Sequence, residues 1–304
     1  MKILVTGANG FIGKALVPQL VSLGHVLVPA VRRPCGLNVE HVVMDEASCR
    51  VALTGCDCVV HLAGRAHVMR EQDIDPLQAF RTANVDATLA LANLAVEAGA
   101  RRFVFISSIK VNGERTAAGK RFRPDDYVAP KDPYGISKWE AEQGLHKIAE
   151  TTGLEVVIIR PPLVYGPGVK ANFAALMRVA KSGIPLPLGA IHNKRSLVSL
   201  GNLVEFIITC TSHPAAANQT FLVSDGHDVS TSDLLRGMAR AGNVPARLLP
   251  IPVSWLRMAG LLLGRKSAID RLCSNLQVDD SKARTLLGWV PPLTVDEGLS
   301  RVQR

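Results

Sequence analysis

The stretch KILVTGANGFIG, residues 2–13, places a short apolar run directly before three regularly spaced glycines. Gly7, Gly10 and Gly13 have GxxGxxG spacing. Missing side chains at these positions permit a tight turn, close approach of backbone N–H groups to a pyrophosphate, and close packing of the next helix. Because the motif stands between a predicted strand and a predicted helix, it predicts a dinucleotide-binding unit at the start of the chain.

Similar apolar runs alternate with helical patterns through the first half of the chain. The runs lie at residues 2–8, 25–32, 41–44, 57–64, 102–108 and 155–162, and the helical patterns at 13–24, 76–99 and 137–153. Continuous Val- and Ile-rich runs are typical of strands buried on both faces of a parallel sheet. The order predicts an α/β fold with a Rossmann-type doubly wound parallel sheet over residues 1–165. Pro-rich loops and shorter helices predict a smaller substrate-binding lobe over 166–304, with some segments returning to the first unit.

Composition limits the classes of partner. The 304 residues are 47% hydrophobic and 20% charged, as in a globular enzyme, and the net charge of +9 favours anionic ligands. The arginines are scattered and aromatics are few, which disfavours nucleic acid. Six cysteines fit reduced thiols better than disulfides or a metal site, and we predict no metal. Without a signal-peptide pattern or a long apolar run, the chain is expected to be cytoplasmic with no transmembrane segment.

One apolar segment, SWLRMAGLLLGRK at residues 254–266, allows two interpretations. A buried helix of the second lobe is the favoured one. The alternative is an interfacial helix at a membrane surface, since Trp255, Arg257, Arg265 and Lys266 flank the apolar residues.

Two further features indicate residues that can take part in catalysis. Tyr134 and Lys138 form a YxxxK pair at helical i, i+4 spacing, which puts phenol and ammonium on one helix face. A nearby ammonium is expected to lower the pKa of the tyrosine and make it usable as a general acid or base. Ser108 ends the predicted strand 102–108, where a hydroxyl reaches the carboxyl edge of the sheet. Ser107 beside it is expected to satisfy backbone groups.

Together these motifs resemble an extended short-chain dehydrogenase/reductase of the NAD-dependent epimerase/dehydratase family, which acts on nucleotide sugars. The resemblance runs from TGANGFIG through HLAG, SSIKVNGE, DPYGISK and RPPLVYGPG to LGWVPPLTVDEGL. It implies a catalytic triad of Ser108, Tyr134 and Lys138. Tyr134 would exchange a proton with the sugar oxygen, Lys138 would hold the nicotinamide ribose, and Ser108 would orient that oxygen.

The resemblance also implies residues that contact the ligands. The implied cofactor contacts, besides Tyr134 and Lys138, are Gly7, Gly10, Phe11, Ile12, Gly13, Asp45, Leu62, Ala63, Gly64, Asn84, Pro161 and Val164. The implied substrate contacts are Ser108, Lys110, Asn172, Arg195 and Arg271. Two helices near residues 80–98 and 138–150 would form a homodimer.

Departures from the family pattern bear on the reaction. Ile109 and Lys110 stand where dehydratases carry an Asp-Glu pair, so dehydration is not expected. Leu163 and Asn112 replace residues common in UDP-galactose 4-epimerases. We therefore expect first a reductase of a UDP-4-keto-6-deoxy-N-acetylhexosamine, in lipopolysaccharide or other bacterial surface-polysaccharide synthesis. A 4-epimerase of UDP-glucose or UDP-N-acetylglucosamine is the alternative.

The cofactor choice depends on the tip of the second predicted strand. Val31 occupies the place of the acidic residue that holds the adenosine ribose of NAD, and Arg32 and Arg33 follow. Either arginine could accept a 2′-phosphate, so NADP is expected to be preferred over NAD. Two other hypotheses remain open: a non-catalytic NADP-binding regulator, and an enzyme that acts on a lipid-linked sugar at a membrane surface.

Overall fold

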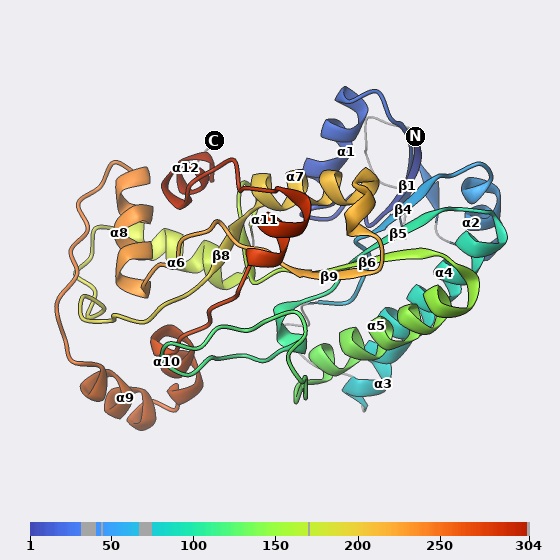
Figure 1. The fold of residues 1–304 in the computed structure, drawn as a ribbon. Coiled ribbons are helices and arrows are strands. Elements are labelled where there is room, and N and C mark those ends of the chain that lie inside the picture. The colour runs from blue at the N-terminus through green and yellow to red at the C-terminus, as the bar shows by residue number, and fades with distance from the viewer. Residues whose placement is uncertain (32–40, 44, 67–74, 170, 303–304) are drawn as a thin grey trace.

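A computed structural model describes residues 1–31, 41–43, 45–66, 75–169 and 171–302, arranged as a large lobe on a parallel sheet and a smaller, mainly helical lobe (Figure 1). The sheet has seven strands in the order β3-β2-β1-β4-β5-β6-β9, and every neighbouring pair is parallel. The strands are β1 (Lys2–Thr6), β2 (Val26–Val31), β3 (Val42–Val43), β4 (Cys58–His61), β5 (Arg102–Ile106), β6 (Glu155–Arg160) and β9 (Gln219–Leu222). The predicted doubly wound Rossmann-type fold is confirmed.

Helices cover both faces of this sheet, so its strands are buried as their apolar sequences predict (Figure 1). One face packs against α1 (Gly13–Ser22), α7 (Leu200–Ser212) and α11 (Ser281–Leu287). The other packs against α2 (Glu46–Leu53), α4 (Ala87–Glu97) and α5 (Pro133–Thr152). The chain reverses its winding between β1 and β4, and ligands of such folds bind at this switch point, outside the carboxyl ends of the strands.

The long helix expected over residues 76–99 is interrupted. It consists of α3 (Pro76–Arg81), a π-helical turn η1 (Thr82–Asp86) and α4. A π-helical turn inserts an extra residue into the helical ladder and often occurs at functional sites. Here it holds the buried Asn84.

Several segments after residue 165 belong to the large lobe. α7 and α11 pack on the sheet, and β9 extends it beside β6. The small lobe contains the two-stranded sheet of β7 (Leu163–Tyr165) and β8 (Leu197–Ser199), with α6 (Ala171–Lys181), α8 (Thr231–Ala241) and α12 (Val295–Arg301) around a separate apolar cluster. The two lobes are therefore joined by several chain crossings.

The helical pair α9 (Val253–Leu262) and α10 (Lys266–Cys273) forms the outer corner of the small lobe (Figure 1). The expectation that this apolar segment is a buried helix is wrong. Only Leu256 and Gly260 of α9 are buried, while Trp255 is 65% and Leu262 is 80% exposed. The reason is that α9 has a single helix, α10, as its main neighbour, and Gly260 gives Ile269 of that helix room to approach.

Among the helices that the structure describes, none has the length and apolar character needed to cross a membrane.

Candidate active site

The turn between β1 and α1 is shaped by two glycines. Gly7 has φ +66°, and a Cβ there would lie 2.9 Å from the backbone nitrogen of Ala63 after β4. A Cβ on Gly13 would lie 2.4 Å from the carbonyl oxygen of Gly7. No side chain caps the start of α1, where Ile12 occupies the cap position. Its first N–H groups therefore have no side-chain acceptor, which is the arrangement that receives a diphosphate.

The carboxyl end of β4 is held to β1 through the buried side chain of His61. His61 Nδ1 lies 2.7 Å from Thr6 Oγ1, and Nε2 lies 3.0 Å from Thr88 Oγ1. Because the Thr88 hydroxyl donates to the Asn84 carbonyl, it accepts from His61, which places the imidazole proton on Nε2. Burial, with a smaller contribution from the Lys138 charge, lowers the pKa of His61 to about 3. His61 is thus a neutral structural residue that the sequence analysis missed.

Asn84 links the segment that follows β4 to helix α5. Its amide nitrogen donates to the Arg65 carbonyl at 3.0 Å and to Ser137 Oγ at 3.0 Å, while its oxygen accepts from the Arg65 backbone N–H at 2.7 Å. The Ser137 hydroxyl in turn donates to the Tyr134 carbonyl. Asn84 therefore fixes the segment after Gly64 relative to the first turn of α5.

The three predicted catalytic residues come together at the carboxyl edge of the sheet. Ser108 follows β5 and caps the short 3-10 helix η2 (Ile109–Val111). Asp132 caps α5, which places Tyr134 in its first turn and Lys138 one turn later. The hydroxyl groups of Ser108 and Tyr134 are hydrogen-bonding neighbours. Lys138 Nζ donates to the Ile106 carbonyl at 2.9 Å and lies 4.4 Å from the centroid of the Phe105 ring.

The pKa of Tyr134 differs from the value expected from the sequence. Burial raises the pKa of Tyr134 to about 12; the Ser108 hydrogen bond lowers it and the Asp132 charge raises it further. The prediction that Lys138 lowers the pKa of Tyr134 is wrong, because the ammonium is turned toward the Ile106 carbonyl and Phe105. Burial also lowers the pKa of Lys138 to about 8, against the opposite effect of Glu142.

A buried ionic group lies beneath the triad, and the sequence analysis missed it. Glu142 is fully buried on α5 and pairs with Arg160 at the end of β6, with 2.6 Å between Arg160 Nη2 and Glu142 Oε2. Ser107 donates its hydroxyl to the same carboxylate. Arg160 also donates to Asn112 Oδ1 at 3.1 Å. This network holds β5, β6 and α5 in register, which in turn fixes Ser108 and Lys138. A Glu four residues after the YxxxK lysine was its only sequence signal.

Lys110 lies beside the triad rather than free in a loop. Its ammonium is 3.2 Å from Asp132 Oδ1 and 3.4 Å from Glu114 Oε1, and it lies 5.9 Å from the Tyr134 ring centroid. Ile109, the other residue at the dehydratase positions, is buried. The two positions therefore supply no acid–base pair of carboxyl groups.

The remaining expected cofactor residues surround the same edge. Leu62, Ala63 and Gly64 follow β4, and a Cβ on Gly64 would lie 3.3 Å from Lys138 Nζ. Asp45 caps α2 by accepting from the Ser48 N–H at 2.8 Å. The other four occupy nearby elements: Phe11 and Ile12 precede α1, Pro161 accepts from the Ile109 N–H, and Val164 lies in β7. Their contacts with a cofactor stay predictions.

Three predicted ligand residues have side chains outside the described part of the chain. Arg32 and Arg33 follow β2 there. Asn172 belongs to α6, and only its helical backbone is described. Val31, the last residue of β2, is described and fully buried.

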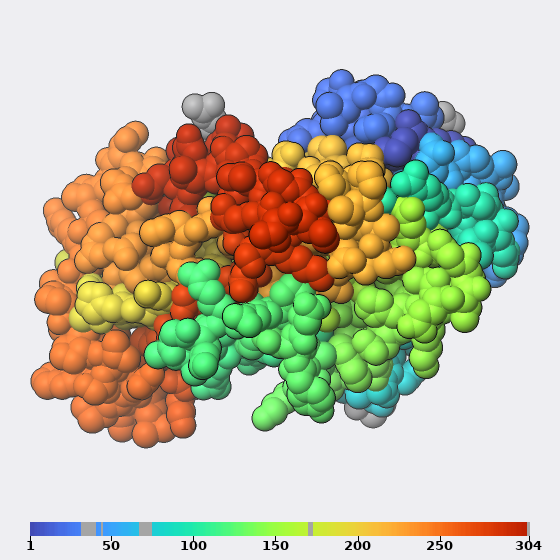
Figure 2. Space-filling model, viewed as in Figure 1, coloured from blue at the N-terminus to red at the C-terminus, as the bar shows by residue number. Residues whose placement is uncertain are grey.

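The two predicted substrate arginines are linked to each other. Arg195 donates through Nη1 to the Arg271 carbonyl at 2.9 Å and to the Ser274 carbonyl at 3.2 Å. Burial lowers the pKa of Arg195. Arg271 lies on α10 and lines a cavity of about 430 Å³ together with Arg115 and Lys266. Residues 113–130 cover the segment 274–280 nearby, through bridges from Thr116 to Asn275 and from Phe122 to Val278 (Figure 2).

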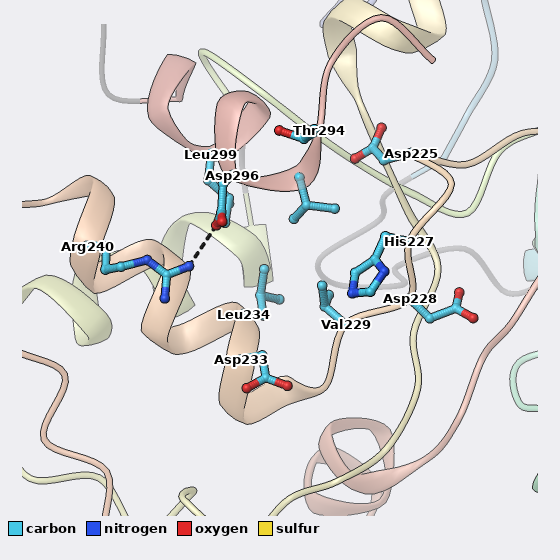
Figure 3. A pocket seen from close by; sticks show the side chains of 11 residues that line it. Asp225, His227, Asp228, Val229, Asp233, Leu234, Arg240, Thr294, Asp296 and Leu299 are labelled. Atoms are coloured by element: carbon cyan, nitrogen blue, oxygen red, sulfur yellow. Dashed lines mark hydrogen bonds and ion pairs between the residues drawn. The ribbon is translucent and has the colours of Figure 1, made fainter. Parts of the chain in front are cut away.

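A second cavity, of about 410 Å³, lies in the small lobe between α8, α12 and residues 225–229 (Figure 3). It is acidic: Asp225, Asp228 and Asp233 line it, and Asp296 pairs there with Arg240 at 2.8 Å. None of the predicted site residues lines it, so the candidate site remains at the sheet edge.

Comparison with known proteins agrees with this geometry. The model of the NAD dependent epimerase/dehydratase family matches residues 3–224. A UDP-glucose 4-epimerase of Vibrio cholerae is 48% identical over 98% of this chain and 93% of its own length. An N-acetyl-alpha-D-glucosaminyl-diphospho-ditrans,octacis-undecaprenol 4-epimerase of Escherichia coli O157:H7 is 26% identical over 98% of this chain and 93% of its own. The crystallised protein MoeE5, solved with UDP-glucuronic acid and NAD, has a TM-score of 0.78 at 25% identity, over 99% of this chain and 97% of that one.

The family model covers most of the chain, and its matched range includes the glycine turn and all three triad residues. The chain is therefore an enzyme of the NAD-dependent epimerase/dehydratase family.

Proposed function

We propose that this enzyme interconverts the C4 epimers of a UDP-linked hexose or N-acetylhexosamine, with NAD or NADP as its cofactor. Ser108, Tyr134 and Lys138 support a redox step at a sugar carbinol. The observation that carries the choice of an epimerase is the 48% identity, over 98% of this chain, to the Vibrio cholerae UDP-glucose 4-epimerase. The reported relatives thus favour the alternative expectation over the first one, a 4-keto reductase.

The residues present fit a dinucleotide. Gly7 packs against Ala63 without a side chain between them, and the start of α1 has no side-chain cap. A diphosphate at this place would lie at the positive end of α1, where no side chain occupies the cap position. When bound, the cofactor supplies the acceptor and donor of hydride at C4 of the sugar.

Within this site Tyr134 moves the proton. In the forward half, its phenolate oxygen takes the proton of the C4 hydroxyl as hydride leaves C4; in the return half, the phenol gives the proton back to the oxygen of the 4-keto sugar. Ser108, bonded to Tyr134, orients that oxygen. Because the pKa of Tyr134 is raised to about 12, forming the phenolate needs positive charge, which oxidised nicotinamide would provide. The Lys138 ammonium would hold the nicotinamide ribose.

The positions that differ from dehydratases fit this proposal. Elimination of water would need an acid–base pair next to Ser108, whereas Ile109 is buried and Lys110 is paired with Asp132 and Glu114. Asn112, which replaces a tyrosine common in UDP-galactose epimerases, binds Arg160 and the Arg123 carbonyl. It therefore supports the fold beneath the site.

The test measures both the sugar product and the oxidation of the reduced cofactor. Purified enzyme is incubated in three separate reactions, with UDP-glucose, with UDP-N-acetylglucosamine, and with a UDP-4-keto-6-deoxy-N-acetylhexosamine. NADPH is added to the reaction with the keto sugar. The products are identified by NMR. We expect a C4 epimer to form without net change in reduced cofactor. Stoichiometric oxidation of NADPH with the keto sugar, and no epimer from the other two, would instead establish the reductase.

A second candidate substrate is a sugar carried on a polyprenyl diphosphate. It is favoured by the name of the Escherichia coli relative and by the exposed apolar side of α9. Turnover of the lipid-linked sugar with no turnover of either UDP-sugar would select it. A non-catalytic regulator is the least supported hypothesis, since Ser108, Tyr134 and Lys138 are all present and assembled.

For the cofactor, we propose that NADP is accepted alongside NAD, since Val31 offers no carboxylate to repel a 2′-phosphate. Binding of NADPH and NADH is compared before and after Arg32→Asp. Loss of NADPH affinity alone supports the proposal, and unchanged affinity for both contradicts it. The homodimer through α4 and α5, which lie side by side on one sheet face, stays a prediction.

A further inference from the structure

The outward side of α9 is an apolar surface, called here the α9 patch and made of Trp255, Met258, Leu261, Leu262 and Leu263. Their exposed fractions range from 58% for Met258 to 80% for Leu262. The patch lies within nine consecutive residues, whereas the other large exposed apolar side chains of the described chain are spread over many elements. A concentrated exposed patch is typical of a surface that contacts a partner.

The geometry of α9 is that of a helix lying flat on an interface. Leu256 and Gly260 face the protein, and Gly260 packs on Ile269 of α10. Trp255, Met258 and Leu262 have i, i+3, i+7 spacing and lie on the opposite side. Both Figures 1 and 2 place α9 at the outer corner of the small lobe, so a flat surface can approach it.

The charges around the α9 patch indicate which surface it fits. Arg257, Arg265 and Lys266 are exposed in or directly after α9. Within the described residues, neither Arg265 nor Lys266 forms an ion pair, so both charges are available to a partner. Lys266 also joins Arg115 and Arg271 around the neighbouring cavity, which Glu114 and Asp270 line as well. Arg257 Nε lies 3.7 Å from Asp270 Oδ1, so within the described part of the chain the unpaired cations beside the apolar strip are Arg265 and Lys266. An apolar strip with such cations at its end is complementary to anionic lipid headgroups above acyl chains.

We propose that α9 docks this enzyme on an anionic lipid bilayer, with the α9 patch inserted between headgroups and Arg257, Arg265 and Lys266 at the phosphate level. The overall charge of +9 adds a longer-range attraction to the same surface. The proposal stands on α9 alone and holds for either substrate class considered above.

The experiment is cosedimentation of the full-length protein with vesicles of phosphatidylcholine, with and without phosphatidylglycerol. We expect binding to the anionic vesicles, weakened at high ionic strength, and at least about tenfold weaker partitioning of the double variant Leu261→Glu, Leu262→Glu. The matched control is Leu23→Glu, Val51→Glu, which makes the same charge change at two exposed positions of the large lobe. The control is expected to bind like the parent.

Trp255 gives a second readout. Anionic vesicles should shift its fluorescence to shorter wavelength, and Trp255→Phe should remove that shift while Trp139 and Trp289 remain. Equal vesicle binding by both double variants, or binding by neither parent nor control, would overturn the proposal. Concentration-dependent dimerisation that only Leu261→Glu, Leu262→Glu abolishes would also overturn it, in favour of a second copy of the chain. Epimerase activity without vesicles should be equal in all variants, so failure of docking is distinguishable from failure of the proposed function.

Discussion

Glu142 lies one helical turn after Lys138 on α5, and its charge raises the pKa of the lysine that burial lowers to about 8. The same carboxylate is held by Arg160 and Ser107. Lys138 therefore keeps its proton near neutral pH because a buried, paired carboxylate stands below it. Glu142 is a positioning residue: it acts on the reaction through Lys138.

The first prediction concerns pH. Since the ammonium form of Lys138 is present below a pKa of about 8, kcat/KM should fall as pH rises through that value. Glu142→Gln removes the charge that raises this pKa, so the falling limb should move to lower pH. The measurement is the pH profile of epimerisation for both proteins.

Loss of stability must be separated from this effect. Glu142→Gln leaves Arg160 without its buried partner, which costs about 3–5 kcal/mol. Leu145→Ala, at a fully buried position on the same helix, destabilises by about 2–5 kcal/mol without touching Lys138. If the Leu145 variant moves the falling limb as far as the Glu142 variant does, the electrostatic role of Glu142 is refuted.

The second prediction concerns the proton donor. Tyr134→Phe should lower kcat by about 10²–10⁴-fold, because general acid–base catalysis is lost. Cofactor binding, followed by fluorescence titration, should change little. Tyr127→Phe, at a side chain that is 94% exposed, is the control and should keep full activity. Retention of more than a tenth of the activity by Tyr134→Phe would exclude Tyr134 as the proton carrier.

The third prediction compares two glycines with left-handed backbones. Gly7 has φ +66° and Gly24 has φ +77°, so alanine adds similar backbone strain at each, about 1–2 kcal/mol. Only at Gly7 does the new Cβ also meet backbone, at 2.9 Å from the Ala63 nitrogen; at Gly24 nothing lies within 4 Å. Calorimetric titration should show that Gly7→Ala loses cofactor affinity and Gly24→Ala keeps it. Equal losses would mean that close packing at Gly7 does not shape the cofactor site.

The fourth prediction concerns acid stability. His61 has its pKa lowered to about 3 in the fold, from an ordinary value of 6.5. Between these values the unfolded chain binds more protons, so the free energy of unfolding should fall as pH drops from 6.5 toward 3, by up to roughly 4–5 kcal/mol. Urea denaturation should show a smaller fall for His61→Gln. His227→Gln, at an exposed position, is the control, and identical slopes for all three proteins would contradict the assignment.

Most of the sheet could be predicted from sequence because its strands are local and strongly patterned. Six apolar runs, each followed by turn residues, became β1 to β6. The seventh strand, β9, is short and lies after the small lobe has begun, so its pairing with β6 is a long-range contact that no local pattern reveals. The π-helical turn at Asn84 was missed for a related reason: its spacing differs from an α-helix by a single residue.

The triad was predictable because its spacing is fixed by one helix and one strand end. The residues that support the triad could not be predicted from the sequence. His61, Glu142 and Arg160 lie on three elements, and their hydrogen bonds appear only after folding. The exposure of α9 was predicted wrongly for the opposite reason: its composition suits a core, but the chain provides only α10 to cover it.

In the proposed epimerisation, hydride leaves and returns to the same sugar carbon. The most direct measurement supplies UDP-glucose or UDP-N-acetylglucosamine carrying deuterium at C4, together with oxidised cofactor and unlabelled reduced cofactor, and determines the label in both epimers. Retention of deuterium at C4 in the product, with no change in total reduced cofactor, is the predicted result. Loss of the deuterium from C4 in the epimer, or no epimer from either sugar, would contradict it.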